Sequence, residues 1–149
     1  MKNLLLFLFA VAVFAGCNQT MEKEKEVVNT IENEKDGMFI HVTSNDPHRV
    51  LMALNMADMV SKDHDVVLYF DIEGVDVLVK DAENLEYAHF PDSFTLINKL
   101  NDKDIKIMAC PGCLKAAGFT PEDLMGGIDV ADKESFFNFT KGRIITLDY

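Results

Sequence analysis

Short, mainly apolar runs alternate with helix-like segments over most of this chain. The runs cover residues 38–42, 66–70, 105–109 and 143–147, and polar segments separate each run from the next. Near-continuous apolar runs are typical of strands that are buried on both faces, and intervening helices allow such strands to pair in parallel. The alternation therefore predicts one α/β domain over residues 38–149, with a parallel sheet that carries helices on both faces.

The segments between these runs show the features of helices. Pro47 suits the first turn of a helix whose apolar positions continue as a stripe along one side. Gly118 is expected to end another helix, because glycine readily adopts the left-handed conformation found there. The helical segments that we expect are 47–62, 74–80, 94–100, 111–117 and 130–140, with a single helical turn at 121–124.

Three loops are expected to meet at one edge of the sheet, because right-handed crossovers bring the carboxyl ends of parallel strands together. These loops are residues 43–46, 71–74 and 110–112. Function in such folds is concentrated at this edge, so the residues there are the first candidates for a site.

The strongest chemical signal at that edge is the run from Cys110 through Pro111 and Gly112 to Cys113. A thiol at the start of a helix faces free N–H groups, which favour its thiolate form. Cys110 is therefore the predicted reactive thiol, and Cys113 its resolving or supporting partner. Three other interpretations stay open: a structural disulfide, half of a metal site, or a Cys113 that belongs to the core. Zinc would need two further ligands, and the four histidines show no paired spacing, so no metal is expected.

Four polar residues at the same edge are weaker candidates: Asn45, Asp46, Asp71 and Glu73. Carboxylates here could bind a cation or polarise a thiol, whereas the alternative is loop solvation and helix capping. His48 lies on the first turn of the helix that follows and is the best candidate for a general base. His41 lies inside a strand and is expected to be a core residue.

The charge of the chain excludes one class of partner. Its 14 Lys and Arg residues face 25 Asp and Glu residues, which gives a net charge of −11. Such a surface repels nucleic acid, so no nucleic-acid partner is expected. The loop at residues 43–46 contains no glycine and cannot form a phosphate loop, so we expect no nucleotide and no other cofactor.

The first 37 residues differ from the rest. Residues 1–16 combine Lys2 with an apolar run of 12 residues, which is typical of a signal peptide because a membrane-spanning helix needs about 20. The ending before Cys17 resembles the site where bacterial lipoproteins are cleaved and lipidated; the alternative is a plain secretory signal. Residues 17–37 are polar and predict a tether. The expected location is the bacterial cell envelope, with the chain lipid-anchored and facing the periplasm or the exterior.

The sequence also resembles the DsrE/DsrF-like proteins of sulfur relay over nearly all of the predicted domain. The stretches that carry the resemblance are 43–54, 64–75, 105–118 and 122–128. The third is the most specific, because sulfur-transfer members carry a persulfide on the cysteine that matches Cys110. The resemblance implies a three-layer α/β/α, flavodoxin-like fold with about five strands. It also implies homo-oligomers, often trimers or hexamers, and dedicated partner proteins.

Together these features predict a membrane-anchored protein that handles sulfur or thiols, as a persulfide carrier or a sulfurtransferase-like protein. It would meet a protein that donates sulfur or exchanges thiols. Two alternatives stay open: a non-catalytic oligomeric binding module with a structural thiol pair, and a thiol–disulfide oxidoreductase.

Overall fold

Strands and helices alternate along the chain in a computed structural model that describes residues 34–149. The strands are β1 (Gly37–Val42), β2 (Asp65–Phe70), β3 (Lys106–Ala109), β4 (Ile128–Val130) and β5 (Ile144–Asp148). The α-helices are α2 (Pro47–Val60), α3 (Ser93–Asn101), α4 (Pro111–Ala117) and α5 (Lys133–Phe137). Two 3₁₀ helices, η1 (Ile72–Leu78) and η2 (Pro121–Asp123), complete the list. Residues Lys35–Tyr149 form one compact unit by themselves.

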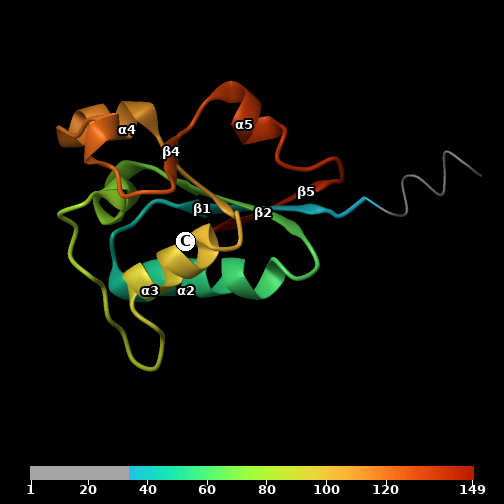
Figure 1. The fold of residues 1–149 in the computed structure, drawn as a ribbon, viewed down its shortest axis with the longest axis horizontal. Helices are drawn as coiled ribbons and strands as arrows, with labels where there is room; N and C mark the ends of the chain where they lie inside the picture. The colour runs from blue at the N-terminus through green and yellow to red at the C-terminus, as the bar shows by residue number, and fades with distance from the viewer. Residues whose placement is uncertain (1–33) are drawn as a thin grey trace, which may run out of the picture. The chain divides into compact units, whose positions relative to one another are not determined.

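The five strands form one sheet in the order β4-β3-β2-β1-β5, and every neighbouring pair is parallel. Figure 1 shows α2 and α3 on one face of this sheet and α4 and α5 on the other. The expected α/β fold, with a parallel sheet of about five strands between helices, is therefore confirmed. The strand order reverses at β1, which lies between β2 and β5.

The two faces of the sheet differ in how much apolar surface they bury. The larger core includes Ile40, Leu68 and Ile107 from the strands, together with Leu51 and Leu54 of α2. The opposite face has a smaller core in which aromatic side chains pack on the strands: Phe39, Val67 and Met108, flanked by Tyr69, Phe136 and Phe139. Because successive side chains of a strand point to opposite faces, His41 shares this second face with Phe39.

Local sequence explains where the helices begin and end. α2 starts at Pro47 because the Asp46 carboxylate accepts a hydrogen bond from the N–H of Arg49, at 3.0 Å. α4 ends at Gly118, whose φ of 86° lies in the left-handed region that glycine tolerates best. Gly74 is required for a different reason: a Cβ there would lie 2.4 Å from the carbonyl oxygen of Val42.

Two details of the predicted secondary structure are wrong. Residues 130–140 were expected to form a helix, but Ile128 pairs with Ile107 and Val130 with Ala109 in the sheet. The helix α5 begins only after Asp132, whose carboxylate accepts hydrogen bonds from the N–H groups of Glu134 and Ser135. The short helix expected at 74–80 is a 3₁₀ helix that begins earlier, at Ile72.

Some features expected from the sequence lie outside the described residues. These are the signal peptide at 1–16, Cys17 and the tether up to residue 33. Within residues 34–149, no helix has both the length and the apolar character needed to cross a membrane.

Candidate functional site

Side chains from four strands or strand ends meet at the carboxyl edge of the sheet. His41 of β1 is in register with Tyr69 of β2 on one side and with Asp148 of β5 on the other. Cys110 directly follows β3, and its N–H donates to the carbonyl of Phe70 at 2.9 Å, which holds it beside the end of β2. Parallel pairing thus gathers residues that are far apart in the sequence.

Cys110 lies at the N-cap of α4, where its sulfur accepts a hydrogen bond from the N–H of Cys113 at 3.4 Å. Pro111 occupies the first helical position, where its missing N–H leaves no hydrogen bond unmade. Both cysteines are free thiols and both are partly exposed. The pair is close, but it is not joined as a disulfide.

The two thiols have opposite electrostatic environments. Burial tends to raise the pKa of Cys110, but hydrogen bonds from the Tyr69 hydroxyl, the Cys113 thiol and the N–H groups of Cys113 and Gly112 lower it overall. The pKa of Cys113 is raised, first by its hydrogen bond to Cys110 and then by burial. Cys110 is thus the more easily ionised thiol, and Cys113 the more easily protonated one.

Tyr69 stays protonated at any physiological pH. Burial raises its pKa far above the ordinary value, and hydrogen bonding to Cys110 raises it further. A hydroxyl that keeps its proton is a permanent donor, and a donor beside a sulfur favours the thiolate. Tyr69 is therefore a positioning residue that stabilises the ionised form of Cys110.

His41 lies between two carboxylates. Its Nδ1 is 2.9 Å from Asp148 and its Nε2 is 2.9 Å from Asp71. The other carboxylate oxygen of Asp71, Oδ1, is buried without a hydrogen-bond partner among the described residues. Burial tends to lower the pKa of His41, but both carboxylates raise it, and the net shift is upward. The ring centre of His41 lies 5.6 Å from that of Tyr69, so this histidine borders the thiol site.

Ile72 holds a strained backbone conformation next to the thiols. Its φ is 47°, in the left-handed region that β-branched residues avoid, at a cost of about 1–3 kcal/mol. Its N–H lies near enough to the Cys113 sulfur to lower the pKa of that thiol in part. The side chain is 62% exposed, so an apolar group faces solvent beside the site.

A family model for the DsrE/DsrF-like family matches residues 38–145. This chain belongs to the DsrE/DsrF-like family. Two solved structures share its fold: MTH1491 of Methanobacterium thermoautotrophicum, a protein of unknown function, and the ychN protein of E. coli.

The likeness to these two structures concerns the fold. For MTH1491 the identity is 20% and the TM-score 0.57, covering 74% of this chain and 98% of that one. For ychN the identity is 12% and the TM-score 0.58, covering 76% and 99%. None of the curated proteins compared with this chain matches it.

The other residues predicted for the site take different places. The ring of His48 stacks on Tyr87, with ring centres 4.3 Å apart. Asp46 caps α2, and Asn45 donates to the carboxylate of Asp76 at 3.3 Å. Glu73 is exposed on the first turn of η1. Of the four polar candidates, Asp71 is the one that joins the cluster of His41 and Tyr69.

Sequence reasoning missed His41, Tyr69 and Asp148 as members of the site. Each is a polar or amphipathic residue within or at the end of an otherwise apolar run, and each lies one position before the last residue of its strand or at its end. That pattern was a usable signal, because residues at matching depths of parallel strands lie side by side. In residues 34–149, no three His, Cys, Asp or Glu side chains are placed to hold a metal ion.

Proposed function

We propose that this DsrE/DsrF-like protein handles sulfur or thiols, with Cys110 as the sulfur-accepting nucleophile and Cys113 as the second thiol. The observation that supports this most is the lowered pKa of Cys110 beside Tyr69 and the N–H groups of α4. A thiolate is the reactive form of cysteine, so a depressed pKa raises the reactive fraction at neutral pH. Partial exposure allows a small sulfur donor to reach it.

The first step is sulfur acceptance. The Cys110 thiolate attacks the outer sulfur of a donor persulfide, and the sulfur–sulfur bond of the donor breaks. The donor leaves as a thiolate, and Cys110 becomes a persulfide, so no outside oxidant or reductant is consumed. Thiosulfate can serve in the same way, with sulfite as the leaving group. The N–H groups that favour the Cys110 thiolate also favour the anionic persulfide that replaces it.

The second step has two routes. In transfer, the thiolate of an acceptor protein attacks the outer sulfur and Cys110 returns to its thiolate. In resolution, Cys113 attacks the inner sulfur, hydrogen sulfide leaves, and a Cys110–Cys113 disulfide forms. That disulfide is the oxidised product, and a dithiol reductant must reopen it. The raised pKa of Cys113 keeps it protonated until Cys110 no longer holds its charge.

The location and partners follow from the N-terminal segment. The proposal places a lipid on Cys17, so that the domain faces the periplasm or the cell exterior on a polar tether. The partner in this compartment would be a protein that donates sulfur or exchanges thiols. The exposed Ile72 beside Cys113 offers such a protein an apolar contact.

Assembly into a homo-oligomer, a trimer or hexamer, is part of the same proposal. β5 is an edge strand whose outer side carries no partner strand within the described residues. Ile144 and Ile145 of β5 are 46% and 40% exposed, and Met59 of α2 is 52% exposed. Exposed apolar side chains on an unpaired edge favour association with another copy. Analytical ultracentrifugation of the chain from residue 17 with Cys17→Ser measures this directly, and a monomer at micromolar concentration contradicts it.

The test of the sulfur role uses the same chain after full reduction. Incubation with thiosulfate and digestion should show the added mass of one sulfur atom on the peptide that holds Cys110. Cys110→Ser should abolish this adduct, whereas Cys113→Ser should make it persist, because resolution is blocked. Cyanide, which removes outer sulfur atoms, should erase it.

Two other outcomes support the alternatives. No adduct, together with a reduction potential of roughly −120 to −270 mV for the pair, indicates a thiol–disulfide oxidoreductase. No adduct and unreactive thiols indicate a binding module, and either result contradicts the sulfur role.

A further inference from the structure

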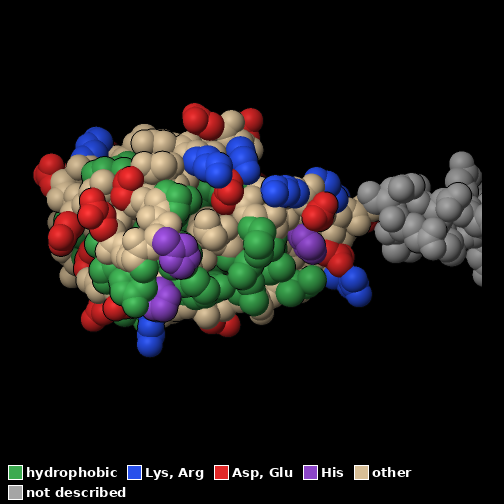
Figure 2. All heavy atoms as spheres, turned by 90° about the horizontal axis from the view of Figure 1, so that it is seen from below, with side chains coloured by type: hydrophobic (Ala, Val, Ile, Leu, Met, Phe, Trp, Pro, Cys, Tyr) green, Lys and Arg blue, Asp and Glu red, His purple; other side chains and the backbone are tan. Residues whose placement is uncertain are grey.

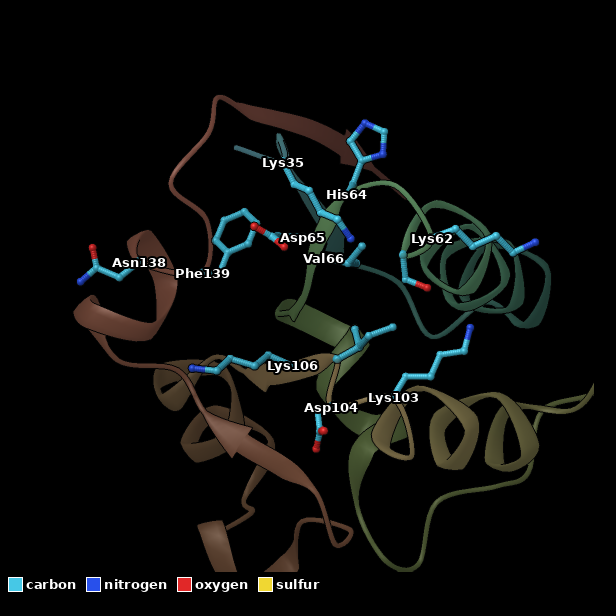
Figure 3. A pocket seen from close by; sticks show the side chains of 12 residues that line it. Lys35, Lys62, His64, Asp65, Val66, Lys103, Asp104, Lys106, Asn138 and Phe139 are labelled. Carbon is cyan, nitrogen blue, oxygen red and sulfur yellow. The ribbon is translucent and has the colours of Figure 1, made fainter. Parts of the chain in front are cut away.

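A hollow lies at the opposite edge of the sheet from the thiols. It has a volume of about 610 Å³ and lies among the starts of β2 and β3 and the C-terminal ends of α2 and α3 (Figure 3). Four lysines line it: Lys35, Lys62, Lys103 and Lys106. Two acids do so as well, Asp65 and Asp104. The hollow thus takes four of the 14 basic residues of the chain but only two of its 25 acidic ones, which makes it locally positive in an acidic protein.

Helix dipoles explain two of these lysines. Lys62 follows α2 and Lys103 follows α3, and a cation near the C-terminal end of a helix is stabilised by the helix dipole. Lys103 also pairs with Asp58, at 2.6 Å. Neither explanation applies to Lys35, which precedes β1, or to Lys106, which opens β3. Lys106 also lines a smaller hollow with Asp132 and Glu134, and its charge helps to lower the pKa of Asp132. Lys35 has neither explanation.

The polar groups of the hollow are incompletely paired. Within residues 34–149, Lys35, Lys62 and Lys106 make no ion pair. His64 lines the hollow too, and its buried Nδ1 has no hydrogen-bond partner in that part of the chain. Figure 3 shows Lys35 reaching in beside the start of β2, while Lys62 points outward. The backbone of Lys35 is held in place, because the Thr140 hydroxyl donates to its carbonyl at 2.9 Å.

We propose that this hollow binds a phosphate group, with Lys35 and Lys106 as its main ligands. Lysine is a common phosphate ligand and acts as a point charge. The volume is in the range of small-molecule sites, which measure about 300–1,000 Å³, and would hold a phosphate with its substituent. Asp65 and Asp104 disfavour a ligand of high negative charge, so a phosphate mono- or diester fits better than a polyanion.

Two sources can supply this chemistry: a soluble phosphate ester, or the headgroup of an anionic lipid. The second rests on the membrane attachment proposed above, because the segment after Cys17 joins the domain at Lys35, at the rim of the hollow. Lipid binding would turn this edge toward the membrane. Cys110 would then lie at the far end of the strands, roughly 20 Å away for strands of about six residues, and would face soluble partners.

The experiment compares two charge-matched double variants of the chain from residue 17 with Cys17→Ser, so that no lipid anchor contributes. Lys35→Gln with Lys106→Gln removes the proposed ligands. Lys80→Gln with Lys115→Gln removes two lysines that do not line the hollow and serves as the control. One arm titrates inorganic phosphate and glycerol phosphate and follows the His64 ring by NMR at constant ionic strength. The other measures sedimentation with vesicles of phosphatidylcholine, with and without phosphatidylglycerol.

Saturable binding in either arm should weaken by about tenfold or more in the Lys35/Lys106 variant and by less than about twofold in the control, since each charged hydrogen bond contributes about 1.5–3 kcal/mol. Binding in the soluble arm identifies a free phosphate ester, and binding in the vesicle arm alone identifies a lipid headgroup. Absence of binding in both arms overturns the proposal, and so does equal weakening in both variants. Reactivity of Cys110 should be unchanged in the Lys35/Lys106 variant, so this test and the sulfur test fail independently.

Discussion

The polar groups at the two edges of the sheet differ in how deeply they are buried. At the carboxyl edge, His41, Tyr69 and Asp71 are partly buried and contact one another or Cys110. At the amino edge, the lysines around the hollow are mostly exposed and three of them have no ionic partner in the described part of the chain. Interactions among buried polar groups are strong and insensitive to salt, whereas those among exposed charges are weak and screened.

This difference suggests a division of roles. At the carboxyl edge, hydrogen bonds outweigh burial and lower the pKa of Cys110, and Asp71 and Asp148 outweigh burial and raise the pKa of His41. A lowered thiol pKa is what thiol chemistry requires. Exposure at the amino edge leaves the lysine side chains accessible to an outside anion. Figure 2 shows acidic side chains gathered toward one end of the domain, whereas Lys and Arg lie among acidic side chains toward the other. If this is correct, the difference in burial should decide how strongly substitutions at each edge act.

The largest expected effect comes from Gly74, which supports the carboxyl edge. In Gly74→Ala, the new Cβ would lie 2.4 Å from the backbone oxygen of Val42. Overpacking of this kind costs about 1–3 kcal/mol, because a backbone atom cannot move aside cheaply. Denaturant unfolding should show this loss, and η1 with Ile72 should shift away from Cys113. The matched control is Gly126→Ala, which meets no atom within 4 Å and should change stability by less than about 0.5 kcal/mol.

The next effect concerns the hydroxyl that donates to Cys110. Tyr69→Phe keeps the ring in the aromatic cluster but removes that donor, so the pKa of Cys110 should rise. The rate of alkylation by iodoacetamide at neutral pH should fall by about tenfold, since a hydrogen bond to a charged group contributes about 1.5–3 kcal/mol. Tyr87→Phe, whose ring stacks on His48, should leave the rate unchanged. An equal fall in both variants would show that Tyr69 acts through packing alone.

A smaller effect is expected in the pH dependence of stability. The pKa of His41 is raised above 6.5 in the folded protein by Asp71 and Asp148, against the effect of burial. The charged form is thus favoured by folding, so this stabilisation is complete below pH 6.5 and is lost as the pH rises through the folded pKa. Unfolding measured across this window should show a decline that His41→Gln abolishes. An NMR titration that gave His41 a pKa at or below 6.5 would contradict it.

More of the fold than of the site could be predicted from the sequence. Four strands were visible as apolar runs of five residues, and buried parallel strands require such runs. β4 was not predicted, because it has only three residues and one of them, Asp129, is exposed. Such a short segment shows no periodic pattern. Cys110 and Cys113 could be found because their spacing is local and a helix start brings them together.

The rest of the site depends on which strands pair and in which register, and this cannot be read from the sequence alone. His41, Asp71 and Asp148 are separated by up to 107 residues and meet only because β1 pairs with both β2 and β5. His48 looked like the better base because it is near the edge loop in sequence, but stacking on Tyr87 holds it elsewhere. Ile72 has no sequence signal at all, since a β-branched residue argues against a left-handed conformation.

The smallest expected effect belongs to the amino edge, where Asp58 accepts from Lys99 at 2.9 Å and from Lys103 at 2.6 Å. Both lysines are more than a third exposed, so Asp58→Asn should cost no more than about 1 kcal/mol. Hydrogen bonding from Lys103 and then Lys99 lowers the pKa of Asp58, so its contribution is present above pH 3.8 and disappears as the pH falls through the lower, folded value.

High salt should weaken this ion-pair network but leave the interactions at the thiol edge unchanged. At about 1 M NaCl the screening length is about 3 Å, and the cost of Asp58→Asn should become small. The effect of Tyr69→Phe on alkylation should persist under the same conditions, because it depends on hydrogen bonding between partly buried groups rather than on exposed charges. If salt reduced both effects equally, depth would not distinguish the two edges, and the proposed separation of buried thiol chemistry from exposed anion binding would lose its physical basis.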